Sequence, residues 1–277
     1  MFPVAWGAPL VVWQGVFYLA PFLFMLVLTF WIVQNFRLTP DATLENWAKI
    51  LATGYFWDAY GRSLLGAGIA ALAGSVLAFP CAYVLGLKVS PQARLLGACL
   101  LITPFFTSYL VRAFTWRTML GDNGVINVAL GYVGLGPFQM IDNLFGTVVG
   151  YLTLVFPLIL VLQLLSLSFV DRRLIEAAHN LGCGGLRVVL VVVVPAARVG
   201  LVLAAAFAFV LSFGDFVSPQ TLGGSNPPTL SLLVVEQIRG AFHWPRASVI
   251  AVVMVATLLS VIAASMALAY RSGGGRR

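Results

Sequence analysis

Residues 171–195 read DRRLIEAAHNLGCGGLRVVLVVVVP, and this segment lies between two long apolar stretches. Its first part favours a short helix over Leu174–Leu181, because it is rich in good helix formers. The two alanines after Glu176 give this helix a flat face, and the acid itself suits the N-terminal turns. Gly182 is placed to end the helix in the left-handed conformation that suits glycine. We therefore expect a helix–turn–helix on the membrane surface, with its second, apolar part stopped by Pro195.

The composition indicates an integral membrane protein. Hydrophobic residues make up 61% of the 277 residues and charged residues only 9%, whereas a soluble domain carries about 25% charged residues. So few charges cannot solvate the surface of a soluble globule, which excludes a cytosolic enzyme and a disordered or fibrous chain. The net charge of +7 is interpreted as a topology signal and not as a nucleic-acid-binding surface.

Gaps between charged residues predict six membrane helices and an all-α membrane fold. About 20 mostly apolar residues cross the hydrocarbon core. The predicted spans are Leu10–Val33, Ser63–Leu87, Leu95–Leu120, Phe145–Phe169, Val199–Leu222 and Ala247–Ala269. We expect the first to be a retained helix and not a signal peptide, because it lacks a basic leader and a clear cleavage site. The apolar run Val188–Pro195 is too short to cross.

The distribution of basic residues predicts the orientation. With both termini in the cytoplasm, nine Lys and Arg residues fall inside and five outside, while Arg112 and Arg117 lie within the third span. The positive-inside rule favours this orientation.

Metal and catalytic chemistry are not expected. The three cysteines have no paired spacing and the two histidines are far apart, so neither a metal site nor a cofactor is predicted. No histidine lies in a span to activate a nucleophile, which disfavours an intramembrane enzyme. A single intramembrane acid and the lack of a convincing internal repeat disfavour an ion-driven secondary transporter.

The segment quoted above resembles the EAA loop of bacterial ABC importer permeases of type I. The triplet at residues 176–178 is followed by a glycine four residues later and by an aliphatic-x-aliphatic-Pro ending thirteen residues after that. Two valines stand where the family usually has Ile and Leu. The residues that the resemblance implies for coupling to an ATPase are Arg173, Glu176, Ala177, Ala178, Gly182 and Pro195.

The resemblance covers about Ala59 to Tyr270 and implies a six-helix type I permease fold. It implies an N-terminal helix and outer loop at 1–58, a permease domain at 59–270 with its coupling loop at about 170–198, and a basic cytoplasmic tail at 271–277. The short helix would sit in a cleft of a cytoplasmic ABC ATPase dimer. No P-loop motif occurs in these 277 residues, so a partner would hydrolyse ATP. An extracytoplasmic substrate-binding protein and membrane lipid would be further partners.

Three other stretches resemble the spermidine/putrescine permease group, in particular the first of its two paired permease types. They are residues 106–116, 120–127 and 212–219. This resemblance implies a polyamine as the solute and a heterodimer with a second homologous permease in the inner membrane. Relatives of the group carry phosphonates, opines, iron, thiamine, sulfate or molybdate, so another small solute, such as an amino-acid-like molecule or an inorganic anion, is the alternative.

Asp215 is a candidate for the solute path. An acid at membrane depth costs roughly 2.5–3.5 kcal/mol, so it should face a cavity or a partner. Phe213 and Phe216 flank it, and aromatic faces with an acid suit an ammonium group. The alternatives are an ion pair with Arg112 and a position near the outer interface.

The two arginines of the third span bear on the sign of the solute. They would repel a polycation unless paired, with Asp122 or Asp142 as possible partners, and they would suit an anion. Tyr109 and Trp116 lie beside these arginines, and we expect them either to belong to an interfacial belt of aromatic residues or to stack on a solute. The complete set of solute-path candidates is Asp215, Tyr109, Arg112 and Trp116.

The stretch Thr229–Phe242 is a candidate outer surface for docking of a substrate-binding protein. We interpret Glu236 and Arg239 in this stretch, and His243 just after it, as solvated loop charges unless they take part in docking.

Overall fold

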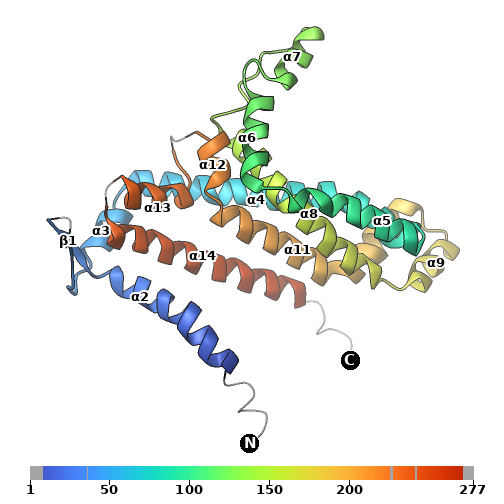
Figure 1. Ribbon diagram of the computed structural model, residues 1–277. Coiled ribbons are helices and arrows are strands. Elements are labelled where there is room, and N and C mark those ends of the chain that lie inside the picture. The colour runs from blue at the N-terminus through green and yellow to red at the C-terminus, as the bar shows by residue number, and fades with distance from the viewer. Residues whose placement is uncertain (1–8, 36, 225–226, 241, 271–277) are drawn as a thin grey trace, which may run out of the picture. The chain divides into compact units, whose positions relative to one another are not determined.

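The computed structural model describes residues 9–35, 37–224, 227–240 and 242–270, most of which are helical (Figure 1). Contacts divide the chain into two units, one formed by Met1–Tyr60 with Thr229–Thr257 and the other by Gly61–Pro228 with Leu258–Arg277. The predicted basic tail at 271–277 lies outside the described residues. Five helices are long and apolar enough to cross a membrane, or six if one bent pair counts as a span.

The first unit contains the N-terminal helix and a small hairpin. Its elements are η1 (Gly15–Leu19), α2 (Ala20–Leu28), β1 (Ile32–Gln34), β2 (Arg37–Thr39), α3 (Glu45–Leu51) and α13 (Leu230–Arg239). The strands pair antiparallel, with Ile32 opposite Thr39. The predicted first span is too long, because the helix ends at Leu28. Beyond that end, the buried Asn46 amide donates to the carbonyl oxygens of Thr29 at 3.0 Å and Trp31 at 2.8 Å.

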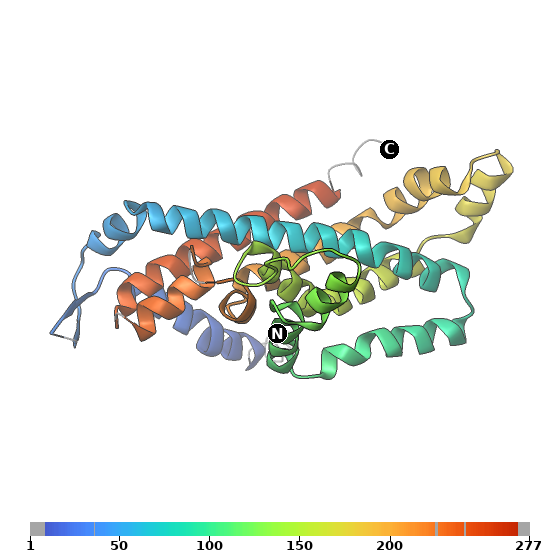
Figure 2. The ribbon, with the colours of Figure 1, turned by 90° about the horizontal axis from the view of Figure 1, so that it is seen from above.

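Long helices form the second unit, and two of them extend into the first. They are α4 (Gly54–Tyr83), η2 (Val84–Lys88), α8 (Leu144–Ser168), α11 (Val194–Gly214) and α14 (Trp244–Tyr270). Helices α8 and α11 lie side by side (Figures 1 and 2). The buried Gln163 of α8 donates to the Ser75 carbonyl of α4 at 3.0 Å, and Ser166 donates to the Ala197 carbonyl of α11 at 3.0 Å. The predicted fourth and sixth spans are confirmed within a few residues.

The third predicted span is not one straight helix. It consists of α5 (Pro91–Ile102), η3 (Thr103–Phe106), α6 (Tyr109–Leu120) and α7 (Val125–Tyr132). The two halves meet at 86°, and α6 stands away from the line of α5 in Figure 1. The bend follows Pro104, which lacks an N–H for a helical bond, and lies where Thr107 is extended. The expectation of a single helix over Leu95–Leu120 is wrong.

The fifth span also differs from the prediction. It runs without interruption from Gly185 to Gly214 through α10 (Gly185–Val188), η4 (Val189–Val193) and α11. Pro195 does not stop it. The wider turn of η4 precedes this proline, which then occupies the first turn of α11, where a missing N–H costs little. The span ends before Leu222, because α12 (Val217–Leu222) is a separate short helix.

Two arginines predicted on the inner side bond to helix-end carbonyls. Arg94 donates to the carbonyl oxygens of Leu85 at 3.0 Å and Gly86 at 2.6 Å. Arg198 donates to those of Leu268 at 2.6 Å and Ala269 at 2.7 Å, near the end of α14. Cations at helix C-terminal ends are stabilising, so part of the positive charge predicted on the inner side has a structural use.

Candidate functional site

The segment quoted at the outset forms α9 (Arg172–Asn180), a short helix with a cap at each end. At its start the Asp171 carboxylate accepts the backbone N–H of Arg173 at 2.9 Å, which satisfies one of the free N–H groups of the first turn. The helix therefore begins two residues before the predicted Leu174. Its boundaries are fixed by residues within the segment itself.

Gly182 ends α9 as predicted. Its φ of +80° is left-handed, and its N–H donates to the His179 carbonyl at 2.9 Å. The next N–H, of Cys183, reaches back to the Ala178 carbonyl at 3.1 Å. This pair of bonds is a Schellman motif, and its left-handed residue is usually glycine.

The two faces of α9 differ in exposure. Ala178 is 8% exposed, and Ile175 packs on the inner core formed by α4, α8 and α11. Glu176, Ala177 and the predicted coupling residue Arg173 are exposed. So are the apolar side chains of Leu174, at 52%, and Leu181, at 85%. A short helix that is anchored on one face, and that presents charged residues and an exposed leucine on the other, suits a partner groove.

Asp215 lies at the break between α11 and α12 and is 8% exposed. One carboxylate oxygen accepts the N–H of Val217 at 2.9 Å and the other accepts the N–H of Ser218 at 3.2 Å. The hydroxyl of Tyr109 donates to the same carboxylate and also contacts the Ser218 hydroxyl. The structure thus brings together two predicted path residues that are 106 positions apart in the sequence.

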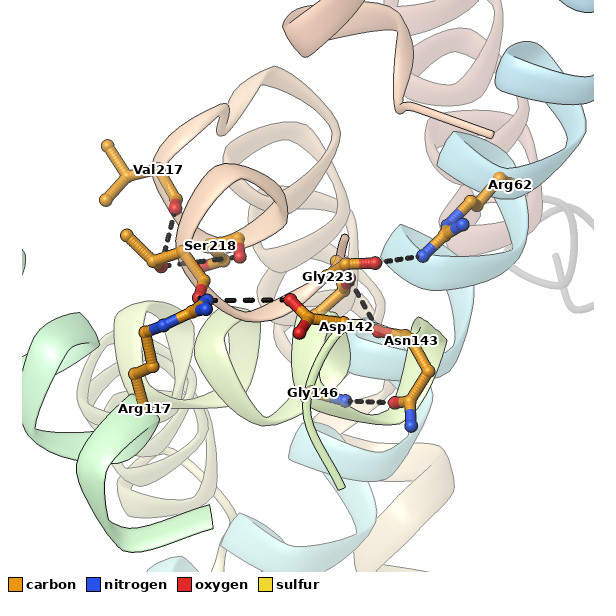
Figure 3. A network of polar contacts seen from close by, with 10 residues as sticks. Arg62, Arg117, Asp142, Asn143, Gly146, Val217, Ser218 and Gly223 are labelled. Carbon is orange, nitrogen blue, oxygen red and sulfur yellow. Dashed lines mark hydrogen bonds and ion pairs between the residues drawn. The ribbon is translucent and has the colours of Figure 1, made fainter. Parts of the chain in front are cut away.

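The opposite end of α12 is held by two arginines (Figure 3). Arg117 donates to the carbonyl oxygen of Thr221 and forms an ion pair with Asp142 at 3.5 Å. Arg62 donates to the carbonyl oxygens of Gly223 and, at 2.7 Å, of Pro227. Of the pairings expected for Arg117, the one with Asp142 is confirmed. Both arginines lie where helix carbonyls are left without partners, which favours positive charge.

Small residues let neighbouring helices approach α12. Ala113 of α6 is 1% exposed and lies midway between Tyr109 and Arg117, so these three share one face of that helix. On the side of α8, a Cβ at Gly150 would lie 2.6 Å from the Cβ of Ser218. Only glycine fits at this point of α8 without displacing its neighbour.

Arg112 and Trp116 lie elsewhere in the same unit. Both line an apolar cavity of about 800 Å³ between α5, α6 and α8, and neither Tyr109 nor Asp215 lines it. The Arg112 guanidinium donates to the Thr153 carbonyl at 2.8 Å and lies 5.9 Å from the centre of the Tyr109 ring. The predicted path residues therefore form two groups, joined by this contact between Arg112 and Tyr109.

The aromatic residues expected beside Asp215 differ from each other. Phe213 is buried and stacks on Phe209 with ring centres 5.5 Å apart, so it cannot offer its face to a solute in this conformation. Phe216 is 39% exposed. Of the two rings, only that of Phe216 is accessible within the unit.

Sequence comparison finds relatives along most of the chain. The spermidine/putrescine transport system permease protein PotB of Haemophilus influenzae is 25% identical over 259 residues, which cover 90% of this chain and 88% of that protein. PotB of Escherichia coli K12 is 27% identical over 205 residues, covering 73% and 74%. The inner membrane ABC transporter permease protein YdcU of the same organism is 26% identical over 226 residues, covering 76% and 72%. No family model matches the chain.

Solved structures share the fold. A bacterial ABC transporter that imports the acidic polysaccharide alginate aligns with a TM-score of 0.77 at 15% identity, over 98% of this chain and 96% of that chain. The MetNI methionine ABC transporter in an inward-facing form aligns with a TM-score of 0.58 at 17% identity, over 82% and 98%. This chain is a permease subunit of the ABC importer type. It has the helical membrane fold that the sequence predicts.

Sequence reasoning missed three parts of the site in this permease. The short helix α12 was expected to be the end of a longer span. Arg62 is one of the five basic residues predicted outside, and its bond to the end of α12 was not expected. Ser218 and the glycine opposite it carry no signal that a single sequence reveals, because small residues in a membrane helix are common.

Proposed function

We propose that this permease carries polyamines such as spermidine and putrescine into the cell. The support from relatives is that two of them are named spermidine/putrescine permeases and match most of the chain. The observation that carries the proposal is the contact of Asp215 with Tyr109 at the break between α11 and α12. A carboxylate beside an aromatic hydroxyl can replace water around an ammonium group.

The arginines near this site are compatible with a cationic solute. Arg62 and Arg117 are directed at the carbonyl oxygens of α12 and at Asp142. The guanidinium of Arg112 is directed at a carbonyl and at the Tyr109 ring. Their charges are thus partly compensated by the protein, which reduces repulsion of an entering cation.

We assign α9 the role of coupling helix, in which Glu176, Ala177 and Arg173 face a groove of a cytoplasmic ABC ATPase dimer. Closure of that dimer would move α9 and shift the bundle between inward-facing and outward-facing states. The proposed assembly also contains a second homologous permease and an extracytoplasmic substrate-binding protein. Both termini of the permease lie in the cytoplasm in this arrangement.

Replacement of Asp215 by Asn tests the proposal. Asn keeps one of the two oxygen acceptors for the N–H groups that start α12 but lacks the charge, so uptake of labelled spermidine by cells with the complete transporter should fall about tenfold or more. Asp122→Asn is the control, because that carboxylate is exposed. Unchanged uptake in Asp215→Asn contradicts the proposed role and leaves this carboxylate as a helix cap alone.

An anionic solute is the second candidate, favoured by the guanidinium of Arg112 on the wall of the 800 Å³ cavity. The same assay separates the two. Under the polyamine proposal, putrescine competes with labelled spermidine and a phosphonate or sulfate does not. Competition by the anion would reverse the assignment.

A further inference from the structure

The two broken helices of the second unit meet at one side-chain contact. Helix α6 begins at Tyr109, directly after the 86° bend in the third span. Helix α11 ends at Gly214, and the backbone is extended at Thr107 before α6 and at Asp215 after α11. The hydroxyl of Tyr109 donates to the carboxylate of Asp215 and so joins the two breaks. Any movement that separates α6 from the start of α12 must therefore break this bond.

The carboxylate of Asp215 is covered in this conformation. The residue is 8% exposed, and its two oxygens accept hydrogen bonds from the N–H groups of Val217 and Ser218 and from the hydroxyl of Tyr109. A carboxylate has about four acceptor positions, so these bonds occupy most of them. The two backbone donors belong to α12, which directly follows the carboxylate. Tyr109 is thus the one of these three donors that comes from a different helix and can leave.

The covered carboxylate lies just beneath the surface of the unit. Gly214 and Phe216, on either side of Asp215, are exposed, and so are residues 105–108, which precede Tyr109. Tyr109 itself is only partly buried. Displacement of this side chain would therefore remove a group that separates the carboxylate from the surface.

The far end of α12 is fixed by backbone as well as side-chain contacts. The Leu222 carbonyl oxygen accepts the N–H of Asp142 at 2.8 Å. A Cβ at Gly146 would collide with the same oxygen, so α8 begins in close contact with α12. The two arginines described above bond to this end as well. The start of α12 is thus its less restrained end, and the hydroxyl of Tyr109 links that end to α6.

We propose that Tyr109 is a latch on Asp215, whose hydroxyl occupies the place of a solute ammonium group until the helices part. In the closed state the O–H of Tyr109 donates to the carboxylate. When α6 moves away, an N–H of the ammonium group replaces it, and the aromatic ring stays beside the cation. This inference rests on the proposed function, which places an ammonium group at Asp215. It adds that the ring favours the solute whereas the hydroxyl competes with it.

The test is direct binding of labelled spermidine to the complete transporter in nanodiscs, without binding protein. Zwitterionic lipid limits binding of the polycation to the membrane itself. Tyr109→Phe keeps the ring and removes the hydroxyl, so the buried carboxylate lacks a donor that an ammonium group then supplies. The dissociation constant should fall about tenfold relative to the wild type. Tyr132→Phe is the matched control, because this tyrosine of α7 is 88% exposed, and it should leave the constant unchanged.

A double variant shows whether the gain in affinity acts through the carboxylate. In the Asp215→Asn background, Tyr109→Phe should give no gain, because the charge for which hydroxyl and ammonium compete is absent. An unchanged or higher dissociation constant in Tyr109→Phe alone overturns the latch, and so does an equal gain in the Asp215→Asn background. Both results leave the proposed function in place as long as Asp215→Asn by itself lowers uptake. If neither the wild type nor Tyr109→Phe binds spermidine, the proposed function is contradicted and the latch with it.

Discussion

Helices α9 and α12 are both short and both adjoin long membrane helices, but they are held in different ways. Helix α9 is exposed on most of its surface and is fixed by its own caps, Asp171 and Gly182. Helix α12 is buried at most positions, is held by side chains from α4 and α6, and packs on α8. An element with local restraints can move as one piece with a partner, whereas α12 can move only if its neighbours rearrange.

This difference fits the proposed division of work between them. A coupling helix must stay helical while it passes the movement of the ATPase to the membrane helices, and its caps at both ends stabilise it for that role. A helix beside the solute path must hold one position until the bundle changes state, because packed interfaces switch between discrete arrangements. Four experiments test whether this contrast is real, in order of decreasing expected effect.

Gly150→Val should have the largest effect on stability. Its Cβ would lie 2.6 Å from the Cβ of Ser218, so α12 must shift from α8, at a cost of about 1–3 kcal/mol. Thermal unfolding of the purified permease measures the loss. Gly68→Val in α4 is the control, because nothing lies within 4 Å of its Cβ position. Equal losses in both variants would show that α12 is not tightly packed against α8.

Gly182→Val should act on α9 alone. Valine at a φ of +80° costs about 1–2 kcal/mol, so the cap opens and uptake is lost while membrane insertion continues. Uptake and the amount of inserted protein are both measured. Gly184→Val provides the control, since this glycine has an extended backbone conformation (φ −67°, ψ 156°) and open space around it. Normal uptake by Gly182→Val would remove the coupling role from α9.

Asp171→Ala should loosen α9 without touching α12. Loss of this N-cap costs about 1 kcal/mol. Amide hydrogen exchange should become faster in the first turn of α9, including the Arg173 N–H, while exchange in α12 stays as in the wild type. Asp171→Asn retains the cap and should exchange slowly. Faster exchange in both helices would mean that the two elements are not independent.

The ion pair of Arg117 with Asp142 should contribute least. Its side chains are 43% and 48% exposed, so a double-mutant cycle with Arg117→Met and Asp142→Asn should give a coupling of about 0.2–1 kcal/mol. High salt should reduce it. A salt-independent coupling would mean that the pair is shielded and restrains α12 more strongly than its exposure indicates.

The contrast between the two helices also explains what the sequence could predict. Helix α9 was predictable because its glycine and the acidic and basic residues around it all lie within a dozen positions. The fourth and sixth spans were predictable because charges bracket them. These features depend on local composition, which a single sequence contains in full.

The breaks in the third and fifth spans were not predictable in the same way. Pro104 precedes the first break, but prolines also lie inside unbroken helices, as Pro80 does in α4 and Pro157 in α8, so a proline alone does not mark where a helix stops. Pro195 led to the opposite error. A proline inside an apolar run predicts the end of a helix, but the π-helical turn η4 precedes Pro195 and the helix continues through it. The arginine contacts to α12 join residues more than 100 positions apart, beyond the reach of motif spacing.

The central claim is that this permease imports polyamines with energy supplied through α9. The most direct measurement is uptake of labelled spermidine by proteoliposomes that contain the complete transporter, with binding protein outside and ATP inside. The account predicts saturable uptake that requires ATP, is competed by putrescine and is abolished by Gly182→Val. Failure to accumulate spermidine, or accumulation that continues without ATP, would contradict it.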